Sequence, residues 1–194
     1  MLKVLLGLGN PGHTFHGTRH NLGFAVIQHL AEQRQVPIDQ RLAGIDGRPA
    51  VVYGDYTHEG QTVRLAMPLT MMNESGEALR VIEASRDDLL IICDDANLPV
   101  GGLRIRAEGG AGGHNGLQSC LEVLGTEQVA RLRIGIGTND MPKHLEDFVL
   151  SRFRADERPA ITAAIGQAAE ACLTWVKEGV AVAMNRYNRS QDPS

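Results

Sequence analysis

Hydrophobic residues along the chain form two kinds of pattern, which alternate. Lys3–Leu8 is a short apolar run that meets glycines at its end, which predicts a buried β-strand. Asn21–Gln35 instead repeats its apolar residues at helical spacing, and Pro37 follows it, so we expect a helix that ends there. Leu89–Ile92 is again continuous and apolar, as strands buried on both faces of a parallel sheet are.

The remaining segments continue this alternation. Further strands are predicted at Ala50–Tyr56, Thr62–Met67, Asp88–Cys93, Leu103–Arg106 and Arg131–Gly137. Further helices are predicted at Glu74–Arg86, Gly116–Leu124, Asp156–Lys177 and Val180–Tyr187. Because no repeat or linker divides the chain, we expect one α/β domain built on a mixed sheet.

Composition narrows the class of protein. The 194 residues are 43% apolar and 22% charged, which is typical of a globular protein and excludes a disordered chain. The sequence has no apolar run of membrane-spanning length, and glycines follow the N-terminus too soon for a signal peptide. Three widely spaced cysteines indicate reduced thiols, so we expect a cytoplasmic protein. The net charge of −4 excludes a basic coat for nucleic acid but leaves a local basic site open.

Glycines directly after the first strand match the G-x-G-x-x-G pattern in Gly7–Gly12. In a dinucleotide site a helix opens at that motif, so that its N-terminus meets the pyrophosphate. Here Asn10, Pro11 and Gly12 form a turn signal, and more loop residues follow before the helix. We therefore expect no dinucleotide, but a tight turn that displays Asn10 at the carboxyl edge of the sheet.

Histidines and carboxylates supply the candidate chemistry. His13, His16 and His20 leave open a metal site with a carboxylate, although no H-E-x-x-H motif is present. For His13 and His16 a surface loop is the favoured interpretation. Asp94 and Asp95 follow the buried strand, a position that favours catalysis but also suits a turn. If that strand continues through them, their side chains point to opposite faces, and only one approaches His20.

A glycine-rich stretch and pairs of arginines complete the candidates. Residues 109–116 contain five glycines and lead into a predicted helix, which suits either phosphate binding at its N-terminus or a flexible loop. Arg104 and Arg106 alternate on one strand, and Arg131 and Arg133 on another, so that each pair shares a face. These pairs fit either a phosphate clamp or a solvated face of the sheet.

Six blocks together give the sequence a family resemblance. In order, they are Gly7–Gly12, Thr18–Asn21, Met72–Gly76, Asp94–Asp95 with Leu98–Pro99, Gly112–Gly116 and Arg131–Gly137. The chain resembles bacterial peptidyl-tRNA hydrolases in this order, from Lys3 to about Asn188. The resemblance implies an α/β/α domain over residues 1–188, with 189–194 as a flexible tail, and an enzyme that cleaves the ester between peptide and tRNA. It also implies a monomer that needs no metal or other cofactor.

Roles for individual residues follow from the same resemblance. It implies that His20 is the catalytic histidine, that Asp94 is its acidic partner and that Asn10 belongs to the catalytic group. Asn73 and Asn115 would bind substrate, and Phe15, Met71 and His114 would contact it. Arg106 and Arg133 would grip the 5′-phosphate of tRNA.

The sequence departs from the common family pattern at four positions. Phe15 replaces a frequent tyrosine and so lacks its hydroxyl, and Met71 replaces a frequent phenylalanine. Cys93 and Asp95 replace a frequent histidine and glutamate beside Asp94.

The chemistry is consistent with direct attack by water. An imidazole has an ordinary pKa of about 6.5 and acts as a general base near neutral pH. Asparagine amides donate to an oxyanion, and no serine or cysteine occupies a nucleophile elbow. The alternative function is a non-catalytic RNA-binding protein of the same fold, against which the presence of the complete set of polar residues argues.

Overall fold

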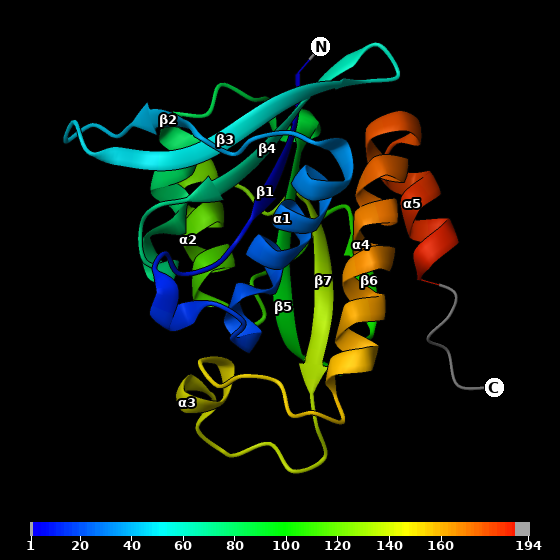
Figure 1. The fold of residues 1–194 in the computed structure, drawn as a ribbon. Coiled ribbons are helices and arrows are strands. Elements are labelled where there is room, and N and C mark those ends of the chain that lie inside the picture. The colour runs from blue at the N-terminus through cyan, green and yellow to red at the C-terminus, as the bar shows by residue number, and fades with distance from the viewer. Residues whose placement is uncertain (1, 189–194) are drawn as a thin grey trace.

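The computed structural model describes residues 2–188, and the expected tail at 189–194 lies outside them. A seven-stranded sheet forms the centre of the molecule (Figure 1). Its strands are β1 (Leu2–Gly7), β2 (Gln40–Ala43), β3 (Pro49–His58), β4 (Gln61–Pro68), β5 (Leu89–Pro99), β6 (Leu103–Arg106) and β7 (Ala130–Gly137). Their spatial order is β2-β3-β4-β1-β5-β7-β6. Neighbouring strands are parallel from β4 to β7, whereas β2, β3 and β6 pair antiparallel.

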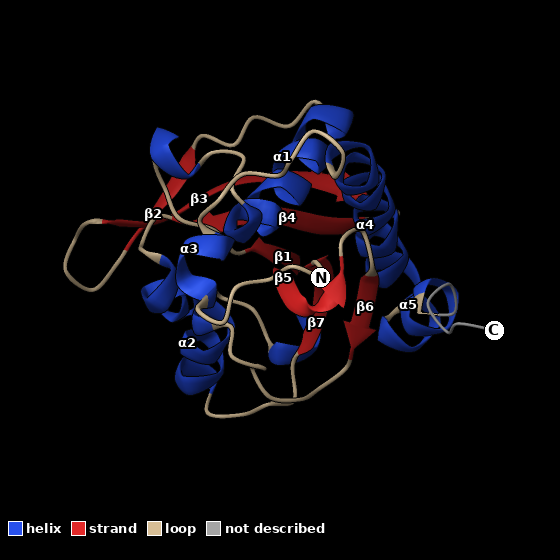
Figure 2. Cartoon of the chain, turned by 90° about the horizontal axis from the view of Figure 1, so that it is seen from below, coloured by secondary structure: helices blue, strands red, loops and turns tan. Residues whose placement is uncertain are grey.

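Helices cover both faces of this sheet. In Figure 2 the sheet runs between α1 (Leu22–Arg34) and α4 (Arg158–Glu178) on one side and α2 (Asn115–Leu124) on the other. α5 (Val180–Tyr187) packs beside α4, and α3 (Leu145–Val149) lies beyond the carboxyl end of β7. Short 3₁₀ segments complete the chain: η1 (His13–Phe15), η2 (Arg19–Asn21), η3 (Met72–Arg80) and η4 (Arg86–Asp88). Within the described residues, no helix is both long enough and apolar enough to cross a membrane.

Two apolar cores lie on opposite faces of the sheet. In β1, Leu5 belongs to the core under α1 and α4, whereas Val4 and Leu6 belong to the core under α2. In β5, Leu90 and Ile91 divide between the two cores in the same way. Residues of both parities are therefore buried, which explains the continuous apolar run in the sequence and confirms the expected α/β/α architecture.

Gly7 and Gly23 let α1 approach β1 closely. A Cβ atom on Gly7 would lie 2.3 Å from the carbonyl oxygen of Gly23, and one on Gly23 would lie 2.3 Å from the backbone nitrogen of Leu8. The first glycine of the G-x-G-x-x-G pattern therefore serves helix–strand packing. This contact brings the start of α1 to the turn that follows β1.

Most of the predicted elements are confirmed with small shifts at their ends, but some predictions were wrong. The helix expected at Glu74–Arg86 is the 3₁₀ segment η3, where the Ser75 hydroxyl donates to the carbonyl of Met72 at 2.8 Å and competes with regular helical bonding. β2 and α3 were not predicted, because both are short and mostly exposed. β5 extends to Pro99 and includes Asp94 and Asp95.

Candidate active site

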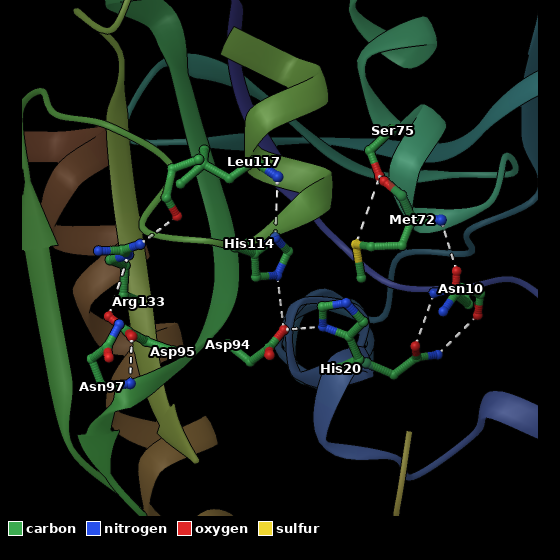
Figure 3. Close-up of polar contacts among 12 residues, drawn as sticks. Asn10, His20, Met72, Ser75, Asp94, Asp95, Asn97, His114, Leu117 and Arg133 are labelled. Carbon is green, nitrogen blue, oxygen red and sulfur yellow. Dashed lines mark hydrogen bonds and ion pairs between the residues drawn. The ribbon is translucent and has the colours of Figure 1, made fainter. Parts of the chain in front are cut away.

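Polar side chains from distant parts of the chain meet at the carboxyl edge of the sheet (Figure 3). Asn10 follows β1, and Asp94 lies in β5 next to it. His20 lies in η2, just before α1, and His114 is the residue that caps the N-terminus of α2. All four side chains are buried, with 3–8% of each residue exposed.

One carboxylate oxygen of Asp94 binds two imidazoles. Asp94 Oδ1 lies 2.8 Å from His20 Nδ1 and 2.9 Å from His114 Nε2. Burial by itself raises the pKa of Asp94, but the charge and hydrogen bonds of His114 and His20 outweigh it and hold that pKa well below its usual range. Asp94 is therefore an ionised acceptor, to which both rings donate.

The tautomer of His114 is determined by the helix that it caps. The backbone N–H of Leu117 donates to His114 Nδ1 at 3.1 Å, so this ring nitrogen carries a lone pair. The proton of the neutral ring is then on Nε2, which donates to Asp94. Helix α2 thus makes His114 a permanent donor to the carboxylate.

The same reasoning shows which nitrogen of His20 has a free lone pair. Because Nδ1 donates its proton to Asp94, the neutral ring has a lone pair on Nε2. Figure 3 shows this ring between Asp94 and Asn10. A buried imidazole that has a fixed tautomer and lies beside a carboxylate is an arrangement that suits general-base catalysis.

Asn10 is held by its neighbours on two sides. Its backbone N–H donates to Asn21 Oδ1 at 2.9 Å, and its carbonyl accepts from Asn21 Nδ2 at 2.9 Å. Its side-chain oxygen accepts the backbone N–H of Met72 at 2.7 Å. The Nδ2 group of Asn10 is therefore the part of this amide that remains to donate to a ligand.

The metal site left open by the sequence does not form with His13 and His16. Those residues are exposed, and the group with metal-like spacing is instead His20, Asp94 and His114, whose ligand atoms lie within 4.8 Å of one another. A metal ligand needs a free lone pair, and His114 Nε2 carries a proton because its Nδ1 accepts from Leu117. Hydrogen bonds therefore explain why these three side chains lie close together.

Comparison with known proteins identifies the family. The sequence profile of the peptidyl-tRNA hydrolases matches residues 4–194. The chain belongs to the peptidyl-tRNA hydrolase family. It is 43% identical over 194 residues to the peptidyl-tRNA hydrolase of Geobacillus thermodenitrificans, an alignment that covers 96% of this chain and 100% of that protein. It is 42% identical over 191 residues to that of Chlorobaculum tepidum, covering 96% and 98% of the two chains.

A solved structure supports the same conclusion. The crystal structure of the peptidyl-tRNA hydrolase of Acinetobacter baumannii superposes with a TM-score of 0.83 at 30% identity, covering 96% of this chain and 94% of that one. The comparisons confirm the resemblance drawn from the motifs, the α/β/α fold and the hydrolase class, and they give no support to a non-catalytic RNA-binding protein.

The other residues that the sequence predicts for a peptidyl-tRNA hydrolase site lie in neighbouring elements. Asn115 is exposed at the first position of α2, and Asn73 is exposed in η3. Met71 precedes η3 and is 44% exposed, whereas Phe15 is half-buried in η1. The ring of His114 binds Asp94 inside the site, and its contact with substrate stays a prediction.

A cavity of about 290 Å³ is lined by candidate catalytic residues and by the glycine-rich loop. Its lining residues include His20, Asp94, His114, Asn115 and Arg133. We refer to it below as the catalytic cavity. α3 forms part of its wall through Leu145 and Val149.

Arginines on β6 and β7 have unequal surroundings. The strands pair Arg104 with Arg133 and Arg106 with Arg131, so all four lie on one face. Arg106 is exposed, but Arg131 is buried and donates to the backbone carbonyls of Gly109, Glu127 and Val129. Neither a phosphate clamp nor a solvated face describes Arg131, which instead holds the glycine-rich loop.

Arg133 is partly buried, whereas Arg106 is exposed and Arg131 is buried. Its Nη2 donates to the carbonyl of Ala111 at 2.8 Å, and its Nε lies 3.4 Å from Asp95 Oδ2. Asp95 Oδ1 in turn accepts the backbone N–H of Asn97 at 2.8 Å. Asp94 and Asp95 therefore point to different partners, as the alternation along an extended strand predicts.

The sequence did not predict that Arg19 anchors η2 through Glu157 and Ser151. Arg19, next to His20, donates from Nη2 to Glu157 Oε2 at 2.7 Å and from Nε to the hydroxyl of Ser151. Its guanidinium also packs over the rings of Phe148 and Phe153. Arg19 belongs to a motif quoted for the family, but no local pattern indicates a partner more than 100 residues away in the sequence.

Proposed function

We propose that this chain hydrolyses the ester that joins a peptide to the terminal ribose of tRNA, with water as nucleophile. The observation that carries the proposal is the shared carboxylate oxygen of Asp94. It accepts from His20 Nδ1 at 2.8 Å and from His114 Nε2 at 2.9 Å, and so leaves His20 Nε2 as the base. Family membership supplies the substrate class.

In the proposed mechanism, His20 Nε2 takes a proton from water as the water oxygen attacks the ester carbonyl. Asp94 stabilises the imidazolium that forms and keeps the ring in its orientation. Asn10 Nδ2 donates to the developing oxyanion, because the side-chain oxygen of Asn10 already accepts the backbone N–H of Met72. Collapse of the intermediate breaks the ester bond, and the proton returns from His20 to the leaving ribose oxygen.

The residues around this centre are proposed to bind the two halves of the substrate. The exposed amides of Asn73 and Asn115 would hydrogen-bond the peptide and the acceptor end, with Phe15 and Met71 beside them. Arg106 and Arg133 would bind the 5′-phosphate of tRNA. We further propose that the enzyme acts as a monomer in the cytoplasm and needs no metal.

One assay tests the activity and the metal independence together. Release of free tRNA from N-acetyl-aminoacyl-tRNA is measured with and without EDTA, and equal rates are expected. Binding of this substrate without release would support the non-catalytic alternative. Activity that EDTA abolishes and zinc restores would contradict the proposed base. Size-exclusion chromatography with light scattering tests the monomer.

A further inference from the structure

A second cavity, of about 460 Å³, adjoins the catalytic cavity across η2. Thr18 and Asn21 line the second cavity, whereas His20 lines the catalytic one, so the turn that carries the base separates the two. The mechanism proposed above does not use this space. Its volume falls within the range of sites that hold small organic groups.

The walls of this second cavity are mostly apolar, and we call it the apolar cavity. α1, β3, β4 and α4 all contribute aliphatic or aromatic residues, among them Leu22, Phe24, Ala25, Val52, Met67 and Ile165. Its polar lining residues include Asn10, His13 and His16. Such a lining favours an apolar occupant, because water in it would find few hydrogen-bond partners.

Asn10 belongs both to the lining of the apolar cavity and to the proposed reaction centre. This residue lines the cavity, and its side chain is held in place by the N–H of Met72. In Figure 3 Asn10 lies on the side of His20 opposite Asp94. A carbonyl that reacts between His20 and Asn10 therefore has the catalytic cavity on one side and the apolar cavity on the other.

The sheet edge is also divided by charge. In the order of strands, Arg106 and Arg133 lie on β6 and β7 at one end. In the middle, Asp94 lies in β5 and Asn10 follows β1. β4 and β3, which line the apolar cavity, come at the other end. A peptidyl-tRNA has the same polarity, with a polyanion on one side of the ester and a peptide on the other.

We propose that the apolar cavity binds an apolar side chain of the peptide, within a few residues of the ester, and so makes the enzyme favour peptidyl-tRNAs with apolar peptide ends. This inference rests on the proposed hydrolysis of peptidyl-tRNA. The side chain would be buried in the apolar cavity while the ester reacts at His20. The preference for apolar peptides is therefore expected in kcat/KM.

The test compares N-acetyl-Leu-Leu and N-acetyl-Asn-Asn esters on one and the same tRNA. Leucine and asparagine are close in size, and repeating the residue tests both positions near the ester. The wild type is expected to favour the leucine substrate by about tenfold in kcat/KM, the scale of discrimination by a small apolar pocket. Ala25→Met fills the cavity from α1, and Val52→Thr makes its wall polar at nearly constant shape. Both variants should move the leucine-to-asparagine ratio toward one.

Ala163→Met is the matched control, because Ala163 is an exposed alanine of α4 outside the cavity lining. It should keep the wild-type ratio. Equal kcat/KM for both substrates in the wild type would overturn the inference. The inference would also be overturned if Ala25→Met and Val52→Thr slowed both substrates but left the leucine-to-asparagine ratio unchanged. The cavity would then only support η2. Failure of the wild type to release tRNA from either ester would instead overturn the proposed function itself.

Discussion

Arg19 Nη2 lies 2.7 Å from Glu157 Oε2, and both residues are almost fully buried. This pair joins the residue before His20 to the residue before α4. Removing one partner of a buried ion pair leaves the other charge without compensation. We therefore expect Glu157→Gln to lower the free energy of unfolding by about 3 kcal/mol, measured by urea denaturation.

The exposed pair of Lys177 and Glu59, 3.2 Å apart, provides the comparison for that measurement. Glu59→Gln should change the free energy of unfolding by less than about 1 kcal/mol, because solvent screens the pair. Equal effects of the two substitutions would show that Arg19 is held by its aromatic neighbours and not by Glu157.

His20→Ala is expected to reduce kcat by about 10²–10⁴-fold, the usual contribution of a general base. Affinity for peptidyl-tRNA should stay within a few-fold, because Nε2 acts mainly in the transition state. His58→Ala is the control, since His58 lies at the opposite end of the sheet, beside the turn between β3 and β4. Retention of more than about a tenth of the wild-type kcat in His20→Ala would place the base elsewhere.

Asp94 and Asp95 are expected to differ sharply although they are neighbours. Asp94→Asn should lower kcat by about 10²-fold or more, because an amide at this position no longer selects the His20 tautomer that has a free Nε2. Asp95→Asn should be mild, since the amide oxygen still accepts the N–H of Asn97. Steady-state kinetics of both variants, after circular dichroism confirms folding, check this. A damaging Asp95→Asn with a mild Asp94→Asn would reverse the assignment.

Acid is expected to remove a contribution of Asp94 to stability. Its pKa is lower in the folded protein than in the unfolded chain, so the ionised carboxylate stabilises the fold above about pH 4, the ordinary value. That contribution is lost as the pH falls from there toward the folded-state pKa. The difference in unfolding free energy between the wild type and Asp94→Asn should thus become smaller as the pH falls below about 4. A difference that is constant down to about pH 3 would contradict the lowered pKa.

Arg106 and Arg133 should separate binding from catalysis. Arg106→Ala should raise KM on full-length substrate, with little change in kcat, and reduce the salt slope of binding by about one. Arg133→Ala should also lower kcat, because its guanidinium binds the carbonyl of Ala111 in the loop that carries His114. A substrate without the 5′-phosphate should be indifferent to Arg106→Ala but still respond to Arg133→Ala. Identical behaviour of the two variants would contradict this division.

The sequence predicts the fold well because the alternation of apolar runs and helical stripes is strong in β1, β5 and α1. It also predicts that Asp94 and Asp95 face different ways, since that follows from strand geometry alone. The contact of His114 with Asp94 was not predictable, because it depends on where the capping residue of α2 meets β5. The pairing of Arg19 with Glu157 is similarly a property of the folded chain, set by residues that are distant in sequence.

Gly7 and Gly23 have a consequence for any search for inactive variants. Neither residue has a side chain that can donate, accept or ionise. Yet a single added carbon at either position would force α1 away from β1, and η2 precedes α1 directly, so the distance from His20 to Asp94 would change with it. A survey limited to polar side chains would miss two of the positions on which the alignment of the proposed base depends.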